Sequence, residues 1–184
     1  IIDPYFSASK IQWLLENIKD QQNLIVGTID TWIIWNLTNK AKHVTDITNA
    51  SRTMLYNIKD EIWDHELLDL FNIRKSILPT VLSNKDEYGR IHTEHFGIEI
   101  PIGGVVGDQQ SASLGQLCLK KGMIKATYGT GCFVLINTDK NKITSKNKLL
   151  TTVASKIDEK KQYAVEGSIF NAGTVIQWLR DEMK

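Results

Sequence analysis

The chain of 184 residues is 42% hydrophobic and 23% charged, which allows one sizeable core or parts of two. Its 22 Lys and Arg residues nearly balance 21 Asp and Glu residues without a large block of one sign, which excludes the basic stripe of a nucleic-acid-binding protein. No apolar run approaches the roughly 20 residues of a membrane helix, and two cysteines give no disulfide framework, so we expect a cytoplasmic protein without membrane insertion.

The region before residue 80 carries three helix signals. Apolar residues repeat at helical spacing after Ser7, which predicts a helix over 7–19. Asp30 is expected to cap a second helix, and Asp64 a third that ends before Pro79.

Strands are expected between and after these helices. Residues 24–27 are predicted to form a short buried strand, and the Thr- and Asn-rich stretch 43–58 a loop followed by a strand. Segment 84–99 has the weakest pattern and is expected to be a surface excursion. Residues 100–106 are then predicted as a strand and 109–118 as a helix, so the pattern indicates a mixed α/β protein.

The pattern changes to hairpins after residue 122. One predicted hairpin pairs 125–128 with 132–137 around a Gly-Thr-Gly turn, and a second pairs 149–154 with 162–166 around a charged turn. A last helix is expected after Asn171-Ala172-Gly173, running through Met183.

Two motifs between residues 104 and 131 indicate a candidate reaction site. Residues 104–110 run an apolar strand into Gly107 and then set Asp108 at the start of the expected helix, where a carboxylate can accept a proton from a substrate hydroxyl. Residues 127–131 set Thr130 between two glycines, and such a turn offers backbone N–H groups and a hydroxyl to phosphate. Taken singly, the aspartate is as readily a helix N-cap, and the turn an ordinary hairpin. Together they suggest phosphoryl transfer to an alcohol.

Six sequence blocks in order resemble the glycerol kinases of the FGGY carbohydrate-kinase family, and on them the chain is identified as a member of that family. Six ordered blocks are far more specific than any one of them. The blocks are Asp3-Pro-Tyr-Phe-Ser7, Gly27-Thr28-Ile29-Asp30-Thr31-Trp32, Asn49-Ala-Ser-Arg-Thr53, Gly107-Asp-Gln-Gln110, Thr127-Tyr-Gly-Thr-Gly-Cys-Phe133 and Ile176-Gln-Trp-Leu-Arg-Asp181.

The resemblance implies a fold and a domain organisation. The family shares a ribonuclease-H-like α/β core with actin-type ATPases, and its members are considerably longer than this chain. We therefore expect an internal segment that carries part of the fold. Residues 1–118 would be the end of the N-terminal domain and 119–184 the start of the C-terminal domain, because the pattern changes near 117–122.

The resemblance also implies residue roles on the glycerol side. Asp108 matches the catalytic base that takes the proton of the attacking hydroxyl, Gln109 matches a residue that hydrogen-bonds a glycerol hydroxyl, and Tyr5 matches a further glycerol contact. From the residues alone, Tyr5 beside Pro4 is more readily a packing anchor, and Gln109 a surface residue.

On the nucleotide side, Thr130, Gly173 and Gln177 match ATP contacts of the family. Gly173 is expected at the start of the last helix, where uncapped N–H groups favour an anion, and Gln177 lies one turn further on the same face. A simple helix-entry glycine is the alternative for Gly173. ATP implies Mg²⁺ as well, for which the sequence offers a contribution from Asp108 and leaves the other ligands open.

Glycerol is the favoured substrate, because Asp108-Gln109-Gln110 stands where sugar kinases of the superfamily commonly have Asp-Asn. The alternatives are a kinase for a pentulose or another polyol, a non-catalytic actin-type ATP-binding module, and an interaction protein built from a degenerate kinase segment. The full-length parent is expected to be a homo-oligomer, and the isolated segment is expected to lack turnover.

Overall fold

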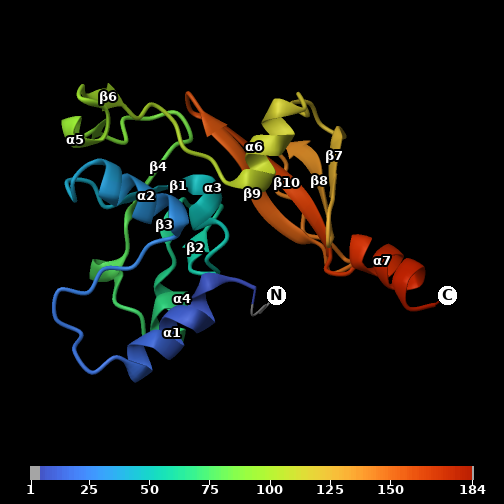
Figure 1. Ribbon diagram of the computed structural model, residues 1–184, viewed down its shortest axis with the longest axis horizontal. Helices are drawn as coiled ribbons and strands as arrows, with labels where there is room; N and C mark the ends of the chain where they lie inside the picture. The colour runs from blue at the N-terminus through green and yellow to red at the C-terminus, as the bar shows by residue number, and fades with distance from the viewer. Residues whose placement is uncertain (1–4, 184) are drawn as a thin grey trace. The chain divides into compact units, whose positions relative to one another are not determined.

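The computed structural model describes residues 5–183, which form two compact units, and Figure 1 labels most of their helices and strands. The N-terminal unit comprises residues 5–107 together with 155–160, and the C-terminal unit comprises residues 108–154 together with 161–183. The chain therefore passes from one unit to the other after Gly107, after Ala154 and after Lys160. The predicted family-domain limits, 1–118 and 119–184, concern family domains rather than contact clusters and stay a prediction.

A short parallel strand pair runs through the N-terminal unit. Strand β1 (Val44–Asp46) is buried along its whole length and pairs with β4 (Thr80–Leu82). The other elements are α1 (Ser7–Asn17), α2 (Ile29–Leu37), α3 (Ile47–Ala50), β2 (Tyr56–Asn57), β3 (Ile62–Trp63), α4 (His65–Leu70), a 3₁₀ turn (Lys75–Ile77), β5 (Arg90–Ile91), α5 (Thr93–Phe96) and β6 (Ile100–Pro101).

One core cluster of this unit joins its helices to its loops. Ile34 of α2, Val44 of β1 and Tyr88 are buried together, and Leu82, Ile102 and Val105 pack against them. Tyr88 is fully buried, and its hydroxyl donates a hydrogen bond of 2.6 Å to the carbonyl of Ser83. The segment 84–99, expected to be a surface excursion, is thus anchored in the core by Tyr88, and Asn84 at its start is buried as well.

Two of the three helix starts in this unit are confirmed. Helix α1 begins at Ser7, and Asp64 caps α4 by accepting a hydrogen bond of 3.2 Å from the N–H of Leu67. The prediction for Asp30 is wrong, because the cap residue of α2 is Thr28. Asp30 lies in the first helical turn, where its buried carboxylate accepts a hydrogen bond of 2.7 Å from the hydroxyl of Thr45.

The strand predictions for this unit are largely wrong. Residues 24–27 form no strand; the N–H of Val26 donates to the carbonyl of Ile77 at 2.8 Å, but no neighbouring strand continues the ladder. Within 43–58 the strand β1 comes first and the short helix α3 follows, where a loop was expected, while the expected final strand is present as β2. Of the predicted strand 100–106 only β6 is regular, where it pairs with β5; beyond it a single bridge joins Gly104 to Lys85.

The C-terminal unit is built on a four-stranded sheet with the order β7-β8-β10-β9. The strands are β7 (Ile124–Tyr128), β8 (Cys132–Asp139), β9 (Leu150–Ile157, whose last three residues cluster with the other unit) and β10 (Lys160–Ile169). Strands β7 and β8 run antiparallel around the Gly-Thr-Gly turn, and β9 and β10 are neighbours in the sheet that follow each other in the chain. Both predicted hairpins are therefore confirmed. Buried Leu135, Ala154 and Ala164 form its core cluster.

Two helices belong to the same unit. Helix α6 (Asp108–Gly115) is shorter than the predicted 109–118, and buried Gln110 anchors it by donating to the carbonyl of Val153 at 3.3 Å. Helix α7 (Gly173–Asp181) begins where predicted and ends before Met183. Among residues 5–183, no helix has the length and apolar character needed to span a membrane.

Candidate active site

Asp108 is the first residue of α6, and its side chain is exposed. Its Oδ1 accepts a hydrogen bond of 2.8 Å from the N–H of Gln109, the next residue. A capping side chain instead accepts from an amide two or three residues further on. This geometry therefore differs from an N-cap and leaves the carboxylate open to a ligand.

The loop that leads into Asp108 is held by a buried polar network in the N-terminal unit. The N–H of Gly107 donates to the hydroxyl of Thr48 at 2.8 Å, and that hydroxyl in turn donates to Asp46 Oδ2. Asn84 donates both to Asp46 Oδ2 at 2.7 Å and to the carbonyl of Val105 at 2.9 Å. The residue before Asp108 is thus fixed by side chains for which the sequence suggested no role.

Asp46 is the centre of this network and is fully buried. Burial raises the pKa of its carboxyl, and hydrogen bonds from Thr48 and Asn49 act in the opposite direction. The backbone N–H of Thr48 lies 2.7 Å from Oδ2, and the Asn49 side-chain amide lies 2.6 Å from Oδ1. A buried carboxylate without hydrogen-bond donors lowers the stability of a fold, and this set of donors offsets that cost for Asp46 at the end of β1.

Gln109 is half-buried and lies between two charged groups. Its Oε1 accepts a hydrogen bond of 2.5 Å from Lys125 Nζ, and its Nε2 lies 3.4 Å from Asp108 Oδ2. Lys125 lies on β7 and has no exposed surface. The structure thus brings Asp108 and Gln109 together as expected, and it adds a buried lysine that sequence reasoning missed.

The Gly129-Thr130-Gly131 turn contacts the start of α7 through backbone atoms. The carbonyl of Thr130 accepts a hydrogen bond of 2.8 Å from the N–H of Ala172, and the carbonyl of Gly129 accepts one of 3.0 Å from the N–H of Gly173. The side chain of Thr130 is exposed at the tip of the hairpin. Two predicted nucleotide residues, Thr130 and Gly173, therefore lie at one junction.

The expectation that α7 starts with uncapped N–H groups holds only in part, because no side chain caps the helix but the carbonyls of the turn accept from the amides of Ala172 and Gly173. Gly173 has a different requirement. A Cβ at this position would lie 2.4 Å from the carbonyl oxygen of Gly129, so only glycine allows the helix to approach the turn. Gln177 lies one helical turn further along α7, and its side chain is exposed.

Tyr5 belongs to the N-terminal unit and is 53% exposed. The guanidinium carbon of Arg52 lies 5.7 Å from its ring centroid, and the ring of Phe6 lies 6.0 Å away in an edge-on arrangement. The buried member of the pair is Phe6, so Phe6 rather than Tyr5 acts as the packing anchor. Asp3 and Pro4, which precede Tyr5 in the same sequence block, lie outside the described residues.

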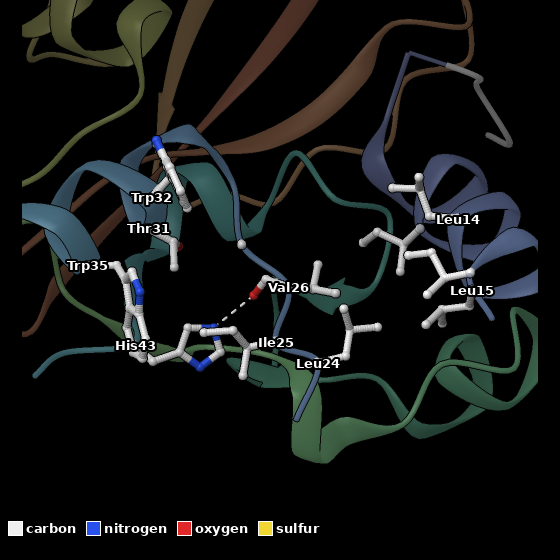
Figure 2. A pocket seen from close by; sticks show the side chains of 12 residues that line it. Leu14, Leu15, Leu24, Ile25, Val26, Thr31, Trp32, Trp35 and His43 are labelled. Atoms are coloured by element: carbon white, nitrogen blue, oxygen red, sulfur yellow. Dashed lines mark hydrogen bonds between the residues drawn. The ribbon is translucent and has the colours of Figure 1, made fainter. Parts of the chain in front are cut away.

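An apolar cavity of about 350 Å³ in the N-terminal unit does not contain any of these residues (Figure 2). It is lined by side chains of α1, of the segment 24–27 and of α2, and by His43, whose Nε2 donates to the carbonyl of Val26 at 2.8 Å. A polyol needs several converging polar groups, and this lining offers almost none. The cavity therefore does not fit a sugar or glycerol.

A resident metal cage is not found either. Within residues 5–183, no group of three or more His, Cys, Asp or Glu side chains comes together. Mg²⁺ in phosphoryl-transfer sites is held by one or two carboxylates plus substrate phosphates, and the exposed carboxylate of Asp108 fits that mode.

Comparisons with known proteins identify the family of the chain. Residues 1–115 match the model of the FGGY family of carbohydrate kinases, N-terminal domain, and residues 124–184 match the model of its C-terminal domain. The chain is 54% identical to the glycerol kinase of Chromobacterium violaceum, over 98% of this chain and 37% of that protein. It is 53% identical to glycerol kinase 1 of Clostridium tetani, over 100% of this chain and 38% of that protein.

Solved structures show the same relationship. The chain resembles the Plasmodium falciparum glycerol kinase with ADP at a TM-score of 0.93 and 43% identity, over 98% of this chain and 38% of that one. It also resembles a ligand-bound xylulose kinase from Lactobacillus acidophilus at a TM-score of 0.79 and 27% identity, over 97% and 37% of the two chains. The expected fold class, part of an actin-type ATPase α/β fold, is confirmed. The chain spans about 38% of the length of its relatives, and it belongs to the FGGY family of carbohydrate kinases.

Proposed function

We propose that this segment belongs to a glycerol kinase, which transfers the γ-phosphoryl group of ATP to glycerol and forms sn-glycerol 3-phosphate. The observation that carries the proposal is the Asp108–Gln109 pair in the first turn of α6, where an exposed carboxylate lies beside an amide held by a buried lysine. The glycerol kinases that match at 53–54% identity support glycerol as the acceptor.

In the proposed reaction Asp108 is the general base. An alcohol is a weak nucleophile, and a carboxylate aligned with its hydroxyl can accept the proton as the new bond forms. The hydroxyl oxygen of glycerol bonds to the γ-phosphorus while the bond from that phosphorus to the bridging oxygen of ADP breaks. The proton moves to Asp108, and ADP leaves with the bonding electrons.

Gln109 and Tyr5 are proposed to position glycerol. The amide of Gln109 can hydrogen-bond a hydroxyl, and half-burial limits the competition from water at that bond. The exposed ring of Tyr5 offers an apolar face for the carbon backbone and a phenol group for a hydroxyl. Both residues bind glycerol in the ground state as well as in the transition state, so their proposed contribution is mainly to substrate affinity.

Thr130, Gly173 and Gln177 are proposed to contact ATP. The exposed hydroxyl of Thr130 can donate to a phosphate oxygen, and Gly173 keeps α7 close enough to the turn for this tip to hold its shape. Mg²⁺, when bound with the nucleotide, would screen the phosphate charge, and Asp108 would contribute one of the groups that hold it. We also propose that residues 1–118 and 119–184 divide between the two family domains.

The setting of the protein is part of the proposal. Cys118 and Cys132 are both free, as thiols are in the reducing cytoplasm, where we place the full-length homo-oligomeric kinase. The charge balance gives no basis for a nucleic-acid partner.

The test is a comparison of acceptors for a full-length kinase that carries this segment. Glycerol and xylulose are each supplied with ATP and Mg²⁺, and kcat/KM is measured by coupled detection of ADP. We expect a higher kcat/KM for glycerol, with glycerol 3-phosphate as the product. A higher value for the pentulose would favour the runner-up, and ATP binding without transfer to any acceptor would favour a non-catalytic module.

A further inference from the structure

Lys125 occupies a position at which a charged side chain is unexpected. It is the second residue of β7, it lies between two exposed residues of that strand, and its own exposed fraction is 0%. Lysine is almost never fully buried unless a partner compensates its charge. An aliphatic side chain would fill this place in the sheet at lower cost, so the ammonium group needs an explanation.

The surroundings of Lys125 explain why a cation is tolerated there. Burial lowers the pKa of its ammonium group, while the negative charges of Asp108 and Glu166 act in the opposite direction. Glu166 on β10 is itself 1% exposed. The hydrogen bond of Lys125 goes to Gln109 Oε1, at 2.5 Å. The cation is thus favoured by the charges of two carboxylates and donates a hydrogen bond to an amide oxygen.

This hydrogen bond fixes which end of the Gln109 amide faces which neighbour. An ammonium group only donates, so it must face the amide oxygen, and the amide nitrogen then lies on the opposite side. That nitrogen is 3.4 Å from Asp108 Oδ2, an acceptor. If the amide were reversed, its nitrogen would face the ammonium group and its oxygen would face the carboxylate, with two repulsive contacts.

We propose that Lys125 is a positioning residue, which locks the amide of Gln109 so that its NH₂ group is presented to Asp108 and to the substrate. The inference rests on the proposed function. Gln109 then acts as a hydrogen-bond donor toward a lone pair of a substrate oxygen. The carboxylate of Asp108 stays free to accept the proton of the attacking hydroxyl. A substrate oxygen at this point must accept a hydrogen bond from the protein, which suits a hydroxyl whose own hydrogen is directed elsewhere.

A double-mutant cycle in a full-length kinase that carries this segment tests the proposal. We expect Lys125→Met to lower kcat/KM for glycerol by about 10- to 100-fold, with the KM for ATP unchanged, because the amide is no longer oriented. In a Gln109→Leu background the same substitution should cost less than about twofold, since no amide remains to be oriented. Lys121→Met, on an exposed lysine just before β7, is the matched control and should leave both constants unchanged.

Other outcomes would overturn the inference. An equal loss in both backgrounds would show that Lys125 acts only through the stability of the sheet, and no loss in either would show that it orients nothing. Because Lys125→Met removes a positive charge that the negative charge of Glu166 influences, the cycle is repeated with Lys125→Met/Glu166→Gln, in which one positive and one negative charge are removed together. If the protein phosphorylates another polyol or a pentulose instead of glycerol, the cycle is scored with that acceptor. Failure of the proposed substrate is then distinct from failure of the role of Lys125.

Discussion

Gly173→Ala tests the junction between the Gly129-Thr130-Gly131 turn and α7. The new Cβ would lie 2.4 Å from the carbonyl oxygen of Gly129, well inside the ~3.5 Å of an ordinary nonbonded contact. The helix start must therefore move by roughly 1 Å. This movement weakens the hydrogen bonds that the N–H groups of Gly173 and Ala172 donate to the turn at 3.0 and 2.8 Å.

We expect this substitution to cost about 2–4 kcal/mol of unfolding free energy, since the overpacking and the weakened hydrogen bonds outweigh the higher helix propensity of alanine. The KM for ATP should rise by about 10-fold, because the tip that carries Thr130 shifts, whereas the KM for glycerol should stay unchanged. Urea denaturation and steady-state kinetics of the full-length protein measure both effects. Gly115→Ala is the matched control, because a Cβ at the end of α6 meets nothing within 4 Å. The reasoning is refuted if the two alanine variants have equal stability and equal KM for ATP.

Three further predictions concern other parts of the molecule. Gln109→Ala should raise the KM for glycerol by about 10-fold and change kcat little, because the lost hydrogen bond is made in ground and transition states alike. Steady-state kinetics in which kcat falls and the KM for glycerol stays the same would place Gln109 in the chemical step. Thr48→Val should lower the unfolding free energy by about 1–3 kcal/mol, because it removes the hydroxyl that joins Gly107 to Asp46. Thr80→Val, at an exposed position of β4, should change the unfolding free energy by less than about 0.5 kcal/mol in the same urea experiment, and equal losses would contradict the network. The isolated 184-residue segment should form no glycerol 3-phosphate, since it spans 38% of its relatives; measurable product from the purified segment would be inconsistent with this.

Local signals predicted the elements whose stabilising contacts are themselves local. The cap of α4 is formed by Asp64 on an amide three residues away, and the hairpin of β7 and β8 closes around the Gly129-Thr130-Gly131 turn. Such contacts can be read from a few consecutive residues. The apolar run 24–27 lacks this property, because whether it becomes a strand depends on a partner that lies elsewhere in the chain.

The candidate site shows the same limit. Asp108 and Gln109 are neighbours in the sequence, so their pairing could be expected before the structure was known. Lys125 could not, because a lysine in a short strand normally indicates a solvated face, and its burial results from the packing of α6 against β7. Asp46 is equally hidden, since its donor Asn84 lies 38 residues further along the chain.

The most direct test of the proposed mechanism is the kcat of Asp108→Asn in the full-length kinase. The amide keeps the shape of the side chain and some hydrogen bonding, so the KM values for glycerol and ATP should change little. Because an amide cannot accept the hydroxyl proton, kcat should fall by about 10²–10⁴-fold. A kcat close to that of the unmodified enzyme would contradict the account, since Asp108 would then only begin α6 and another group would be the base.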